Sequence, residues 1–335
     1  MLIALVFSVT LLGSWAMTWG LRRYALAHNV LDVPNSRSSH QVPTPRGGGM
    51  AIVVTCSLAL AALALSDLLP ASLFYALSGS GALVALVGFV DDHRPLSARW
   101  RLLAHFLAAA WGLFWLGGMP EVRIPGVGAL PGWLWGLLGL VYLVWLLNLY
   151  NFMDGIDGIA GTEAICVCLG GAILFALAGR YEMVLLPVLL ALASAGFLFW
   201  NFPSARIFMG DAGSGYLGLL LGLFSLQAAW VAQELFWSWL ILLGVFIVDA
   251  SVTLLRRLLQ GSRVYEAHCS HAYQHAARQL GRHLPVTLAV AVINLCWLLP
   301  LSLWAAHGGY GFFILLLAYA PLILLALRYR AGLAG

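Results

Sequence analysis

The chain has 335 residues, of which 62% are hydrophobic and only 9% charged, and its mean hydropathy is +0.93. This composition excludes an ordinary soluble protein and indicates a protein whose solvent is the lipid bilayer. All 17 basic residues are arginine, since the chain contains no lysine. Arginine in such a chain indicates contact with anionic lipid, and we expect no nucleic-acid partner.

A bilayer core of about 30 Å requires roughly 20 consecutive apolar residues in a helix. The runs of about that length cover residues 2–21, 49–68, 71–90, 101–118, 131–150, 160–178, 182–200, 213–231, 236–255, 284–306 and 309–327. They are continuously apolar and do not alternate in period two, which excludes a membrane β-barrel. We therefore expect an all-α polytopic membrane protein of about eleven transmembrane helices, with residues 1–335 forming a single integral membrane domain.

The arginines predict the orientation. Fifteen of the seventeen fall on one side of the predicted bundle, and only Arg123 and Arg180 fall on the other. Arginine-rich loops remain in the cytoplasm, so we expect a periplasmic N-terminus, a cytoplasmic C-terminus and a multi-pass location in the bacterial inner membrane. The first run is a retained span and not a cleaved signal, because Arg22 and Arg23 follow its apolar stretch instead of preceding it.

Acidic residues and histidines gather on the arginine-rich side, whereas the loops of the other side are short or featureless. A transporter would be expected to place ionisable residues near the bilayer midplane instead. We therefore expect an active-site cleft on the cytoplasmic face. A polytopic transporter of an anionic or polyprenyl-linked solute is the alternative.

The first loop of that side, residues 32–49, contains three prolines and ends in three glycines. Glycines allow backbone amides to approach an anion closely. Together with Arg37, His40 and Arg46, the loop is suited to binding a diphosphate. The alternative is an ordinary positively charged loop stiffened by proline.

Asp91 and Asp92 are adjacent carboxylates at the inner end of the run 71–90. Two charges at an apolar helix end are costly unless they meet cations, so the pair indicates Mg²⁺ binding or proton transfer. The alternative is a solvated helix end neutralised by Arg94 and Arg99.

The run 131–150 closes with a polar block that reads Asn148-Leu-Tyr-Asn151-Phe-Met-Asp154-Gly155-Ile156-Asp157-Gly158. Steps of three residues turn about 300° on an α-helix, so the four polar residues cannot share one face. The two Asp-Gly pairs mark a helix end and a turn where backbone donors become available. Two amides and two acids emerging from a membrane span favour a functional site over an ordinary turn.

The segment before the run 213–231 contains Asn201, Phe208 and, among glycines, Asp211. An aspartate at a helix N-terminus is suited to hold Mg²⁺ beside a phosphate, which makes Asp211 the candidate metal ligand. Phe208 is an aromatic residue suited to stacking on a base. The alternative is a flexible connector with a capping aspartate.

The longest inner loop, residues 260–283, is rich in histidine. If it is helical, His268, His271 and His275 share one face and are suited to bind zinc or a phosphate. The alternative is an amphipathic surface helix. Asp249, inside the preceding span, is expected to be functional or to pair with an arginine two turns away.

Together these loops resemble the polyprenyl-phosphate N-acetylhexosamine-1-phosphate transferases, which start lipid-linked peptidoglycan, enterobacterial common antigen and O-antigen synthesis. The resemblance spans most of the chain and rests on Asp91-Asp92, the block from Asn148 to Gly158, and Phe208-Met-Gly-Asp211-x-Gly-Ser, in the family's order. It implies a helical bundle of ten or eleven spans with a cytoplasmic cleft.

The resemblance also implies roles. Asp211 resembles the Mg²⁺ ligand, with Mn²⁺ as an alternative ion, and Phe208 resembles the aromatic that stacks on uracil. Asp91 resembles the group proposed to deprotonate the lipid phosphate, with Asp92 supporting it. The nucleotide-facing residues that it implies are Asn201, Asp154, Gly155, Ile156 and Asp157. We also count Asp157 and His271 as catalytic candidates, and Asn148 and Asn151 as substrate-binding candidates.

The reaction that we expect is attack of undecaprenyl phosphate on the β-phosphorus of a UDP-N-acetylhexosamine, with release of UMP. Arg37, Arg46 and His271 are expected to offset phosphate charge. Since UMP is an oxyanion leaving group, direct attack is favoured over a covalent intermediate on Asp91 or Asp92. A homodimer is compatible with the resemblance.

The chain departs from the family pattern in two loops. Arg37-Ser-Ser-His40 lacks the lysine of the family's Arg-Lys-x-His run, and only His271 clearly matches its triple-histidine loop. This variant is most similar to the branch that starts O-antigen chains. The sugar stays open between N-acetylglucosamine and a 6-deoxy-N-acetylhexosamine, such as the fuco or quinovo isomer. A CDP-alcohol phosphotransferase is disfavoured, because the arginine of that family's pattern is missing after Asp154-Gly-Ile-Asp-Gly.

Overall fold

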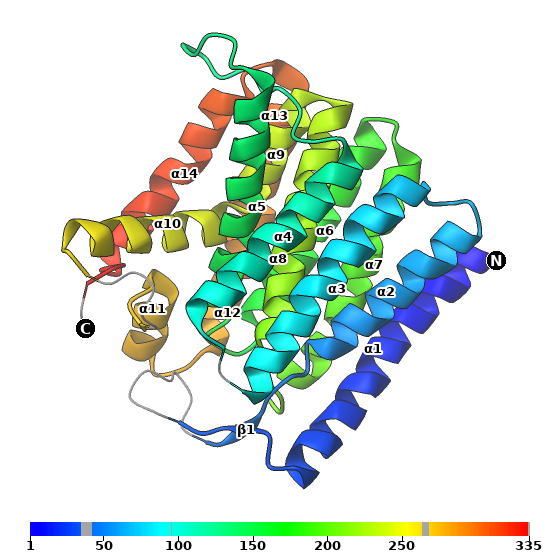
Figure 1. Ribbon diagram of the computed structural model, residues 1–335. Helices are drawn as coiled ribbons and strands as arrows, with labels where there is room; N and C mark the ends of the chain where they lie inside the picture. The colour runs from blue at the N-terminus through cyan, green and yellow to red at the C-terminus, as the bar shows by residue number, and fades with distance from the viewer. Residues whose placement is uncertain (35–41, 95, 263–267, 334–335) are drawn as a thin grey trace.

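The computed structural model describes residues 1–34, 42–94, 96–262 and 268–333, which form a bundle of apolar helices (Figure 1). In chain order the helices are α1 (Leu2–Ala27), α2 (Met50–Leu65), α3 (Ala71–His93), α4 (Ala98–Leu116), α5 (Gly132–Met153), α6 (Ile159–Leu177), α7 (Tyr181–Asn201), α8 (Asp211–Val231), α9 (Gln233–Leu242), α10 (Gly244–Leu259), α11 (Ala272–Leu280), α12 (Leu284–Ile293), the π-helical segment η1 (Asn294–Leu298), α13 (Leu299–Gly308) and α14 (Gly311–Arg328). Strands β1 (Leu31–Asp32) and β2 (Thr44–Pro45) pair antiparallel, with Leu31 opposite Pro45.

All eleven predicted apolar runs are helical, which confirms the all-α polytopic membrane fold. In the described part of the chain, eight helices are long and apolar enough to cross a bilayer. Two of the other predicted runs form helices that are too short or too polar to count as membrane spans. α2 has 16 residues and spans about 24 Å, less than the hydrocarbon thickness. α4 carries Arg99, Arg101 and His105 in its first turns.

The run 236–255 is not the single straight span that the sequence predicted. It divides into α9 and α10, whose axes differ in direction by 72°. Near the break, the hydroxyl of Tyr319 donates a hydrogen bond of 2.7 Å to the carbonyl of Leu240. A broken membrane helix is tolerated where neighbouring protein groups satisfy the freed backbone atoms. α10 consequently runs across the bundle (Figure 1) and carries Asp249 to α11.

α8 lies at the centre of the bundle and is almost completely buried. α3 and α5 pack directly on it. Small residues permit this approach, because a Cβ atom on Gly218 would lie only 2.6 Å from the carbonyl oxygen of Leu146. Membrane helices pack through such close contacts, since lipid provides no hydrophobic force between them. The N-terminus of α8, and with it Asp211, is therefore held in place by its neighbours.

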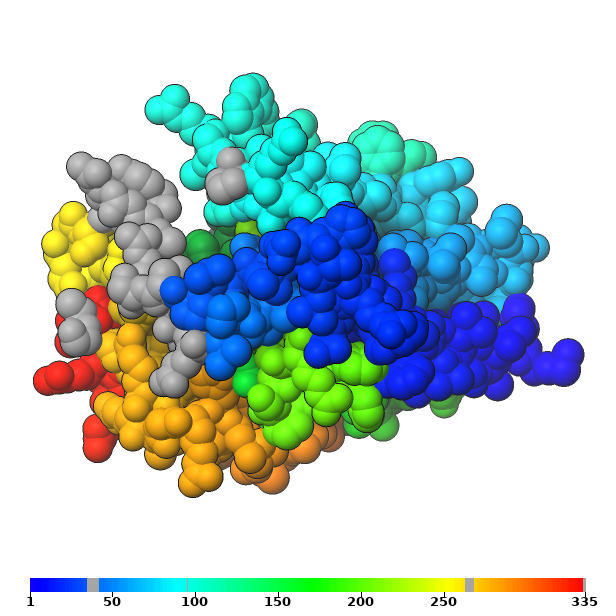
Figure 2. All heavy atoms as spheres, turned by 90° about the horizontal axis from the view of Figure 1, so that it is seen from below, coloured from blue at the N-terminus to red at the C-terminus, as the bar shows by residue number. Residues whose placement is uncertain are grey.

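From α3 to α8 successive helices alternate in direction (Figure 1), so the C-terminal ends of α3, α5 and α7 lie at the same end of the bundle as the N-terminal ends of α4, α6 and α8. Figure 2 views the molecule from this end, where blue, cyan, yellow-green and orange parts of the chain come together on one surface. We call it the polar end, and define it by Arg46, Asp91, Asp154, Asp211 and His271. Segments that are distant in sequence thus contribute to one site.

Candidate active site

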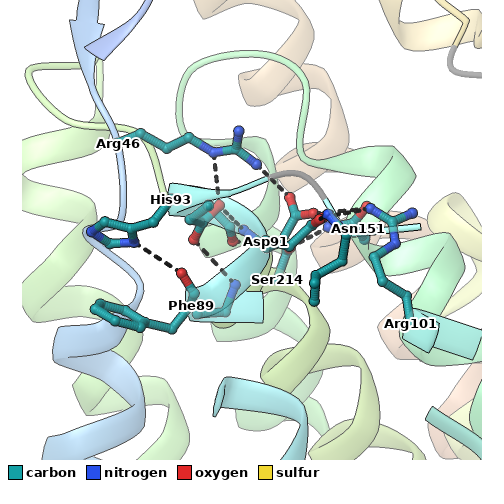
Figure 3. Close-up of polar contacts among 12 residues, drawn as sticks. Arg46, Phe89, Asp91, His93, Arg101, Asn151 and Ser214 are labelled. Atoms are coloured by element: carbon teal, nitrogen blue, oxygen red, sulfur yellow. Dashed lines mark hydrogen bonds and ion pairs between the residues drawn. The ribbon is translucent and has the colours of Figure 1, made fainter. Parts of the chain in front are cut away.

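Arg46 links two acids that come from different helices (Figure 3). Its Nε lies 2.8 Å from Oδ1 of Asp92 at the end of α3, and its Nη2 lies 2.7 Å from Oδ1 of Asp211 at the start of α8. The backbone N–H of Phe208 donates to the carbonyl of Pro45 at 2.8 Å, which ties the two loops together. Charge-assisted contacts of this length are stronger than neutral hydrogen bonds. Three of the predicted site residues therefore form one network.

Arg101, in the first turn of α4, is a second arginine that contacts Asp211, and it also contacts Asp91 (Figure 3). Its Nη1 lies 2.6 Å from Oδ2 of Asp91 and 3.4 Å from Oδ2 of Asp211. The other oxygen of Asp91 accepts the backbone N–H of Leu96 at 2.5 Å. Asp211 consequently lies between two guanidinium groups, and both oxygens of Asp91 are engaged within the protein.

Asp92 caps the N-terminus of α8. Its carboxylate accepts the backbone N–H of Asp211 at 3.0 Å and lies 3.5 Å from that of Ala212, and only 1% of its side chain is exposed. Gly210 precedes the helix with a φ of +80°, and a Cβ atom there would lie 2.5 Å from the Asp92 carboxylate. A carboxylate at this place satisfies free amides and the positive end of the helix. The structure thus gives Asp92 a supporting position, through which it orients Asp211.

Asn148 and Asn151 line a small cavity beside Asp211. The Nδ2 of Asn151 donates to the hydroxyl of Ser214 at 3.0 Å, and the Nδ2 of Asn148 donates to the carbonyl of Val144 at 2.7 Å. Polar side chains that share this cavity include Asp91, Arg101 and His105. The structure therefore places both predicted asparagines next to the predicted acids.

Asp154 follows the last residue of α5 and is partly exposed. Withdrawal from solvent, and then the charge of Asp211, raise the pKa of Asp154 to about 7, whereas the charge of Arg46 opposes this shift. Carboxyl groups that disfavour each other's ionisation form a place that attracts a cation. We refer to Asp91, Asp92, Asp154 and Asp211 as the acid cluster.

Gly155 packs against Tyr273 of α11. A Cβ atom on Gly155 would overlap the Tyr273 hydroxyl, which donates to the carbonyl of Phe152 at 2.9 Å. Gly155 thus brings α11 close to the end of α5. The next residue, Ile156, is 5% exposed and belongs to the hydrophobic core. A nucleotide contact at Ile156 would therefore have to come from its backbone.

Asp157 is held by α12. The hydroxyl of Thr287 donates to the carbonyl of Asp157 at 2.8 Å, and Nδ1 of His283 lies 3.2 Å from its Oδ1. Asp157 and His283 border a pocket of about 460 Å³ whose lining also includes Thr44, Ser204, Phe208 and Arg282. An aromatic ring, a carboxylate and an arginine in one pocket are suited to a base, a ribose and a phosphate.

Asn201 uses both ends of its side-chain amide inside the protein. Its Oδ1 accepts the N–H of Gly158 at 2.9 Å, and its Nδ2 donates to the carbonyl of Ile207 at 2.9 Å. Only 3% of the residue is exposed. Asn201 is thus placed to hold the turn that carries Phe208 against the start of α6.

The histidine loop does not form the single helical face that it would present if it were helical throughout. α11 begins at Ala272, so His275 lies within it while His268 and His271 precede it. The rings of His268 and His271 nevertheless stack with centroids 4.9 Å apart. Burial, and then the proximity of His271 and Arg257, lower the pKa of His268 to about 4. His268 is therefore neutral beside His271 at physiological pH.

Asp249 meets α11 and not an arginine of its own helix, so that predicted pairing is wrong. Its carboxylate accepts the backbone N–H groups of Ala272 at 2.9 Å and Tyr273 at 3.0 Å. Arg256 instead donates to the carbonyl of Ala331 at 2.8 Å. An apolar pocket of about 200 Å³ borders this contact, with a lining that includes Val245, Ala276, Val290, Leu322 and Leu325.

Arg37 and His40 lie outside the described residues. Within the described ranges, no group of three His, Cys, Asp or Glu side chains is arranged to hold a metal ion. Magnesium commonly takes only one or two carboxylates and completes its shell with water and substrate phosphates. The partly exposed carboxylates of Asp154 and Asp211 match that chemistry.

Several residues that complete the site were not among the predicted ones: Arg101, Ser214, Tyr273 and His283. The sequence shows Arg101 and His283 as ionisable residues near the ends of apolar runs. It does not show their partners, which lie on other segments of the chain. Ser214 follows Asp211 by three residues, a spacing that places it one turn along the same helix. For Tyr273 we find no signal in the sequence.

Residues 73–229, which contain the whole acid cluster, match the model of glycosyl transferase family 4. A probable undecaprenyl-phosphate N-acetylglucosaminyl 1-phosphate transferase of Bacillus subtilis is 29% identical over 88% of this chain and 81% of its own. A decaprenyl-phosphate N-acetylglucosaminephosphotransferase of Mycolicibacterium smegmatis is 29% identical over 83% of this chain and 76% of its own. A phospho-N-acetylmuramoyl-pentapeptide-transferase of Moorella thermoacetica is 31% identical over 62% of this chain and 68% of its own.

Proposed function

The chain belongs to glycosyl transferase family 4, and from that premise we propose that it transfers an N-acetylhexosamine 1-phosphate from a UDP-sugar to undecaprenyl phosphate. The observation that carries the proposal is the acid cluster with Arg46 and Arg101 at the polar end of a membrane bundle. Phosphoryl transfer needs little covalent chemistry from a protein and depends on positioning and charge neutralisation. This cluster supplies both.

The charges of the cluster support a divalent cation as cofactor. Four carboxyl groups meet two guanidinium groups, which leaves two negative charges when all are ionised (four minus two). Asp211 and Asp154 would hold Mg²⁺ together with the donor diphosphate. The ion supplies charge neutralisation at the phosphates when it is bound. Arg46 and Arg101 each contact Asp211, so both are placed to change partner from carboxylate to phosphate when the donor binds.

The pocket beside Asp157 is the proposed nucleotide site. Phe208 offers its ring to the base, and Arg282 offers a positive charge that the donor phosphates can use. Thr287 and His283 fix Asp157 in this pocket. Phe208 is three residues from Asp211 in the chain, so a base at Phe208 would carry its diphosphate toward the acid cluster.

The apolar pocket between α10, α11, α12 and α14 is the proposed entry for the polyprenyl chain. Its walls are aliphatic, and it reaches Asp249 and Tyr273, next to His271. An isoprenoid lying there would carry its phosphate toward His271. The apolar lining favours the lipid acceptor over the charged donor at this place.

In the proposed reaction, an oxygen of the lipid phosphate forms a bond to the β-phosphorus of the donor. The bond from that phosphorus to the bridging oxygen breaks, and UMP leaves with the electron pair. A phosphate monoester is largely dianionic at neutral pH, because its second pKa is about 6. Since both oxygens of Asp91 are engaged, we propose that Asp91 positions Arg101 and that direct attack needs no strong base.

N-acetylglucosamine is the sugar that we propose first, because the names of the Bacillus and Mycolicibacterium relatives support it. A 6-deoxy-N-acetylhexosamine is the second candidate, and the product would start a lipid-linked O-antigen or another envelope glycan. The polar end would face the cytoplasm of the inner membrane, where nucleotide sugars are found.

Release of UMP by the purified protein tests this function. The assay contains detergent, Mg²⁺, undecaprenyl phosphate and a panel of UDP-N-acetyl sugars. We expect lipid-dependent UMP release that Asp211→Asn lowers by at least about 100-fold, since lost stabilisation of developing charge costs about 10²–10³ in rate. Asp67→Asn, at the opposite end of the bundle, is the matched control and should keep full activity. UMP release that does not depend on the lipid, or that survives Asp211→Asn, would contradict the proposal.

A further inference from the structure

Asp249 is a buried carboxylate that the reaction described above does not use. It lies in α10, and 7% of the residue is exposed. Its Oδ1 accepts the N–H of Ala272 at 2.9 Å and the hydroxyl of Thr253 at 3.1 Å, and its Oδ2 accepts the N–H of Tyr273 at 3.0 Å. The carboxylate thereby holds the N-terminus of α11, a favourable place for a negative charge.

His271 is the residue immediately before α11, and its ring lies against the same carboxylate. Nδ1 of His271 is 3.4 Å from Oδ1 of Asp249. This nitrogen is buried, and its 3.4 Å contact with the carboxylate does not have the geometry of a hydrogen bond. A distance of 3.4 Å is long for a hydrogen bond, and such contacts commonly tighten when substrate binds. The backbone of His271 is already fixed, because its N–H donates to the side chain of Gln274 at 3.2 Å.

We propose that Asp249 is the positioning residue of His271: its carboxylate accepts the Nδ1–H of the imidazole and leaves Nε2 for the substrate phosphates. This inference rests on the proposed function, in which His271 offsets phosphate charge. A carboxylate on Nδ1–H fixes the tautomer and orientation of an imidazole and stabilises the imidazolium form. A phosphate oxygen accepts hydrogen bonds, and with Nδ1–H on the carboxylate the imidazolium form presents an N–H at Nε2.

The surroundings of the ring support this assignment. The ring of His268 stacks on it at 4.9 Å, and the ring of Phe152 lies 6.4 Å away, so rotation of the imidazole is restricted. The bend between α9 and α10 is what brings Asp249 under α11. The break in the helix thus places Asp249 where it can orient His271.

A double-mutant cycle tests the proposal with the full-length protein. The variants are Asp249→Asn, His271→Ala and the two combined, and kcat and KM for the UDP-sugar are measured for each. We expect Asp249→Asn to lower kcat by about 10–100-fold with little change in KM. The double variant should be no slower than His271→Ala alone, because Asp249 acts through His271.

Two further variants separate positioning from folding. Asp249→Glu keeps the carboxylate and should restore part of kcat. Thr253→Val removes another hydrogen bond to the same oxygen without touching His271, and should keep kcat within about threefold of the wild type. Losses that multiply in the double variant, or an equal loss in Thr253→Val, would overturn the proposal and leave Asp249 as a support of α11.

A spectroscopic readout does not depend on turnover. ¹⁵N NMR of histidine-labelled protein reports which ring nitrogen carries the proton, and the His271 signals are assigned by their loss in His271→Ala. We expect an Nδ1–H signal in the wild type that Asp249→Asn removes. An unchanged signal overturns the inference even if the enzyme is active. Absence of UMP release with this signal present would instead contradict the proposed function alone.

Discussion

The carboxyl group of Asp154 should make the ligand-free protein sensitive to pH. Its pKa is raised to about 7, first by withdrawal from solvent and then by Asp211. Between about pH 4 and pH 7 the folded protein therefore binds a proton that the unfolded chain has lost, so the free energy of unfolding falls as pH rises through this range. We expect Asp154→Asn to raise the free energy of unfolding by about 1–2 kcal/mol more at pH 8 than at pH 5, after discounting for partial exposure.

Thermal unfolding in detergent at the two pH values measures this difference. The same unfolding measurement is repeated at pH 8 with added Mg²⁺. A cation that pairs with the Asp154 carboxylate should stabilise the wild type more than the variant. An equal gain at pH 5 and pH 8 would mean that Asp154 does not carry the raised pKa.

Gly155 and Tyr273 form a pair whose substitutions should compensate. In Gly155→Ala the new methyl group overlaps the Tyr273 hydroxyl, and overpacking of this kind costs about 1–3 kcal/mol. Tyr273→Phe removes that hydroxyl together with its hydrogen bond to Phe152. We expect Gly155→Ala to lower the unfolding temperature and raise the KM for the donor, and to do both less in a Tyr273→Phe background. Equal effects in the two backgrounds would exclude the contact as the cause.

At the residue scale, the sequence identified the acids but not their partners. Asp91, Asp154 and Asp211 were predictable because ionisable residues are rare and costly in an apolar chain. Arg101 contributed to the sequence prediction only as one of the fifteen arginines on the same side of the bundle. In the structure it forms ion pairs with both Asp91 and Asp211. Asp249 was expected to be functional or to pair with an arginine of its own helix. The pairing was wrong, because helical spacing reveals neighbours on one element only. Contacts between elements depend on how the helices are packed.

At the scale of helices, the contact between α3 and the start of α8 should control the site. A Cβ atom on Gly88 would overlap the backbone of Ala212. Gly88→Ala must therefore separate α3 from α8 and weaken the hydrogen bond that the N–H of Asp211 donates to Asp92. We expect a loss of about 1–3 kcal/mol in stability and a larger loss in kcat. Gly136→Ala, in α5 with no atom near the added methyl group, is the matched control. Thermal unfolding and UMP release measure both effects.

The helices that the sequence did not predict correctly are those whose course depends on tertiary contacts. The run 236–255 is largely apolar apart from Asp249 and contains no proline, so no signal stronger than the single Gly244 marks the 72° bend. Gly244 begins α10, and a Cβ atom there would lie 3.0 Å from the ring of Tyr319. The bend therefore depends on packing against α14, which lies about 75 residues further along the chain.

For the whole molecule, apolar runs and alternating direction were sufficient to predict that the polar loops meet at one end. The number of membrane spans was harder to predict from the sequence, because α2 is short and α4 begins with charged residues. α2 buries half of its residues against neighbouring helices. α4 carries Arg101 at the polar end, where it meets Asp91 and Asp211. The number of membrane crossings thus depends on packing as well as on hydropathy.

The arginines predict the orientation of the bundle, and the proposed function depends on that orientation. A nucleotide sugar is highly charged and does not cross a bilayer unaided, so the proposed function requires that the acid cluster faces the compartment that contains the donor. Single cysteines test this in a background whose five native cysteines are replaced. Val127→Cys lies on the loop opposite the polar end, and Gln279→Cys lies on the exposed part of α11.

In intact cells we expect a membrane-impermeant maleimide to label Val127→Cys but not Gln279→Cys, and in inverted vesicles we expect the reverse. The physical reason is the retention of arginine-rich loops in the cytoplasm. The reverse pattern would place the acid cluster outside, where a UDP-sugar could not reach it. That outcome would contradict the orientation and the donor together, whereas UMP release in detergent would still test the chemistry alone.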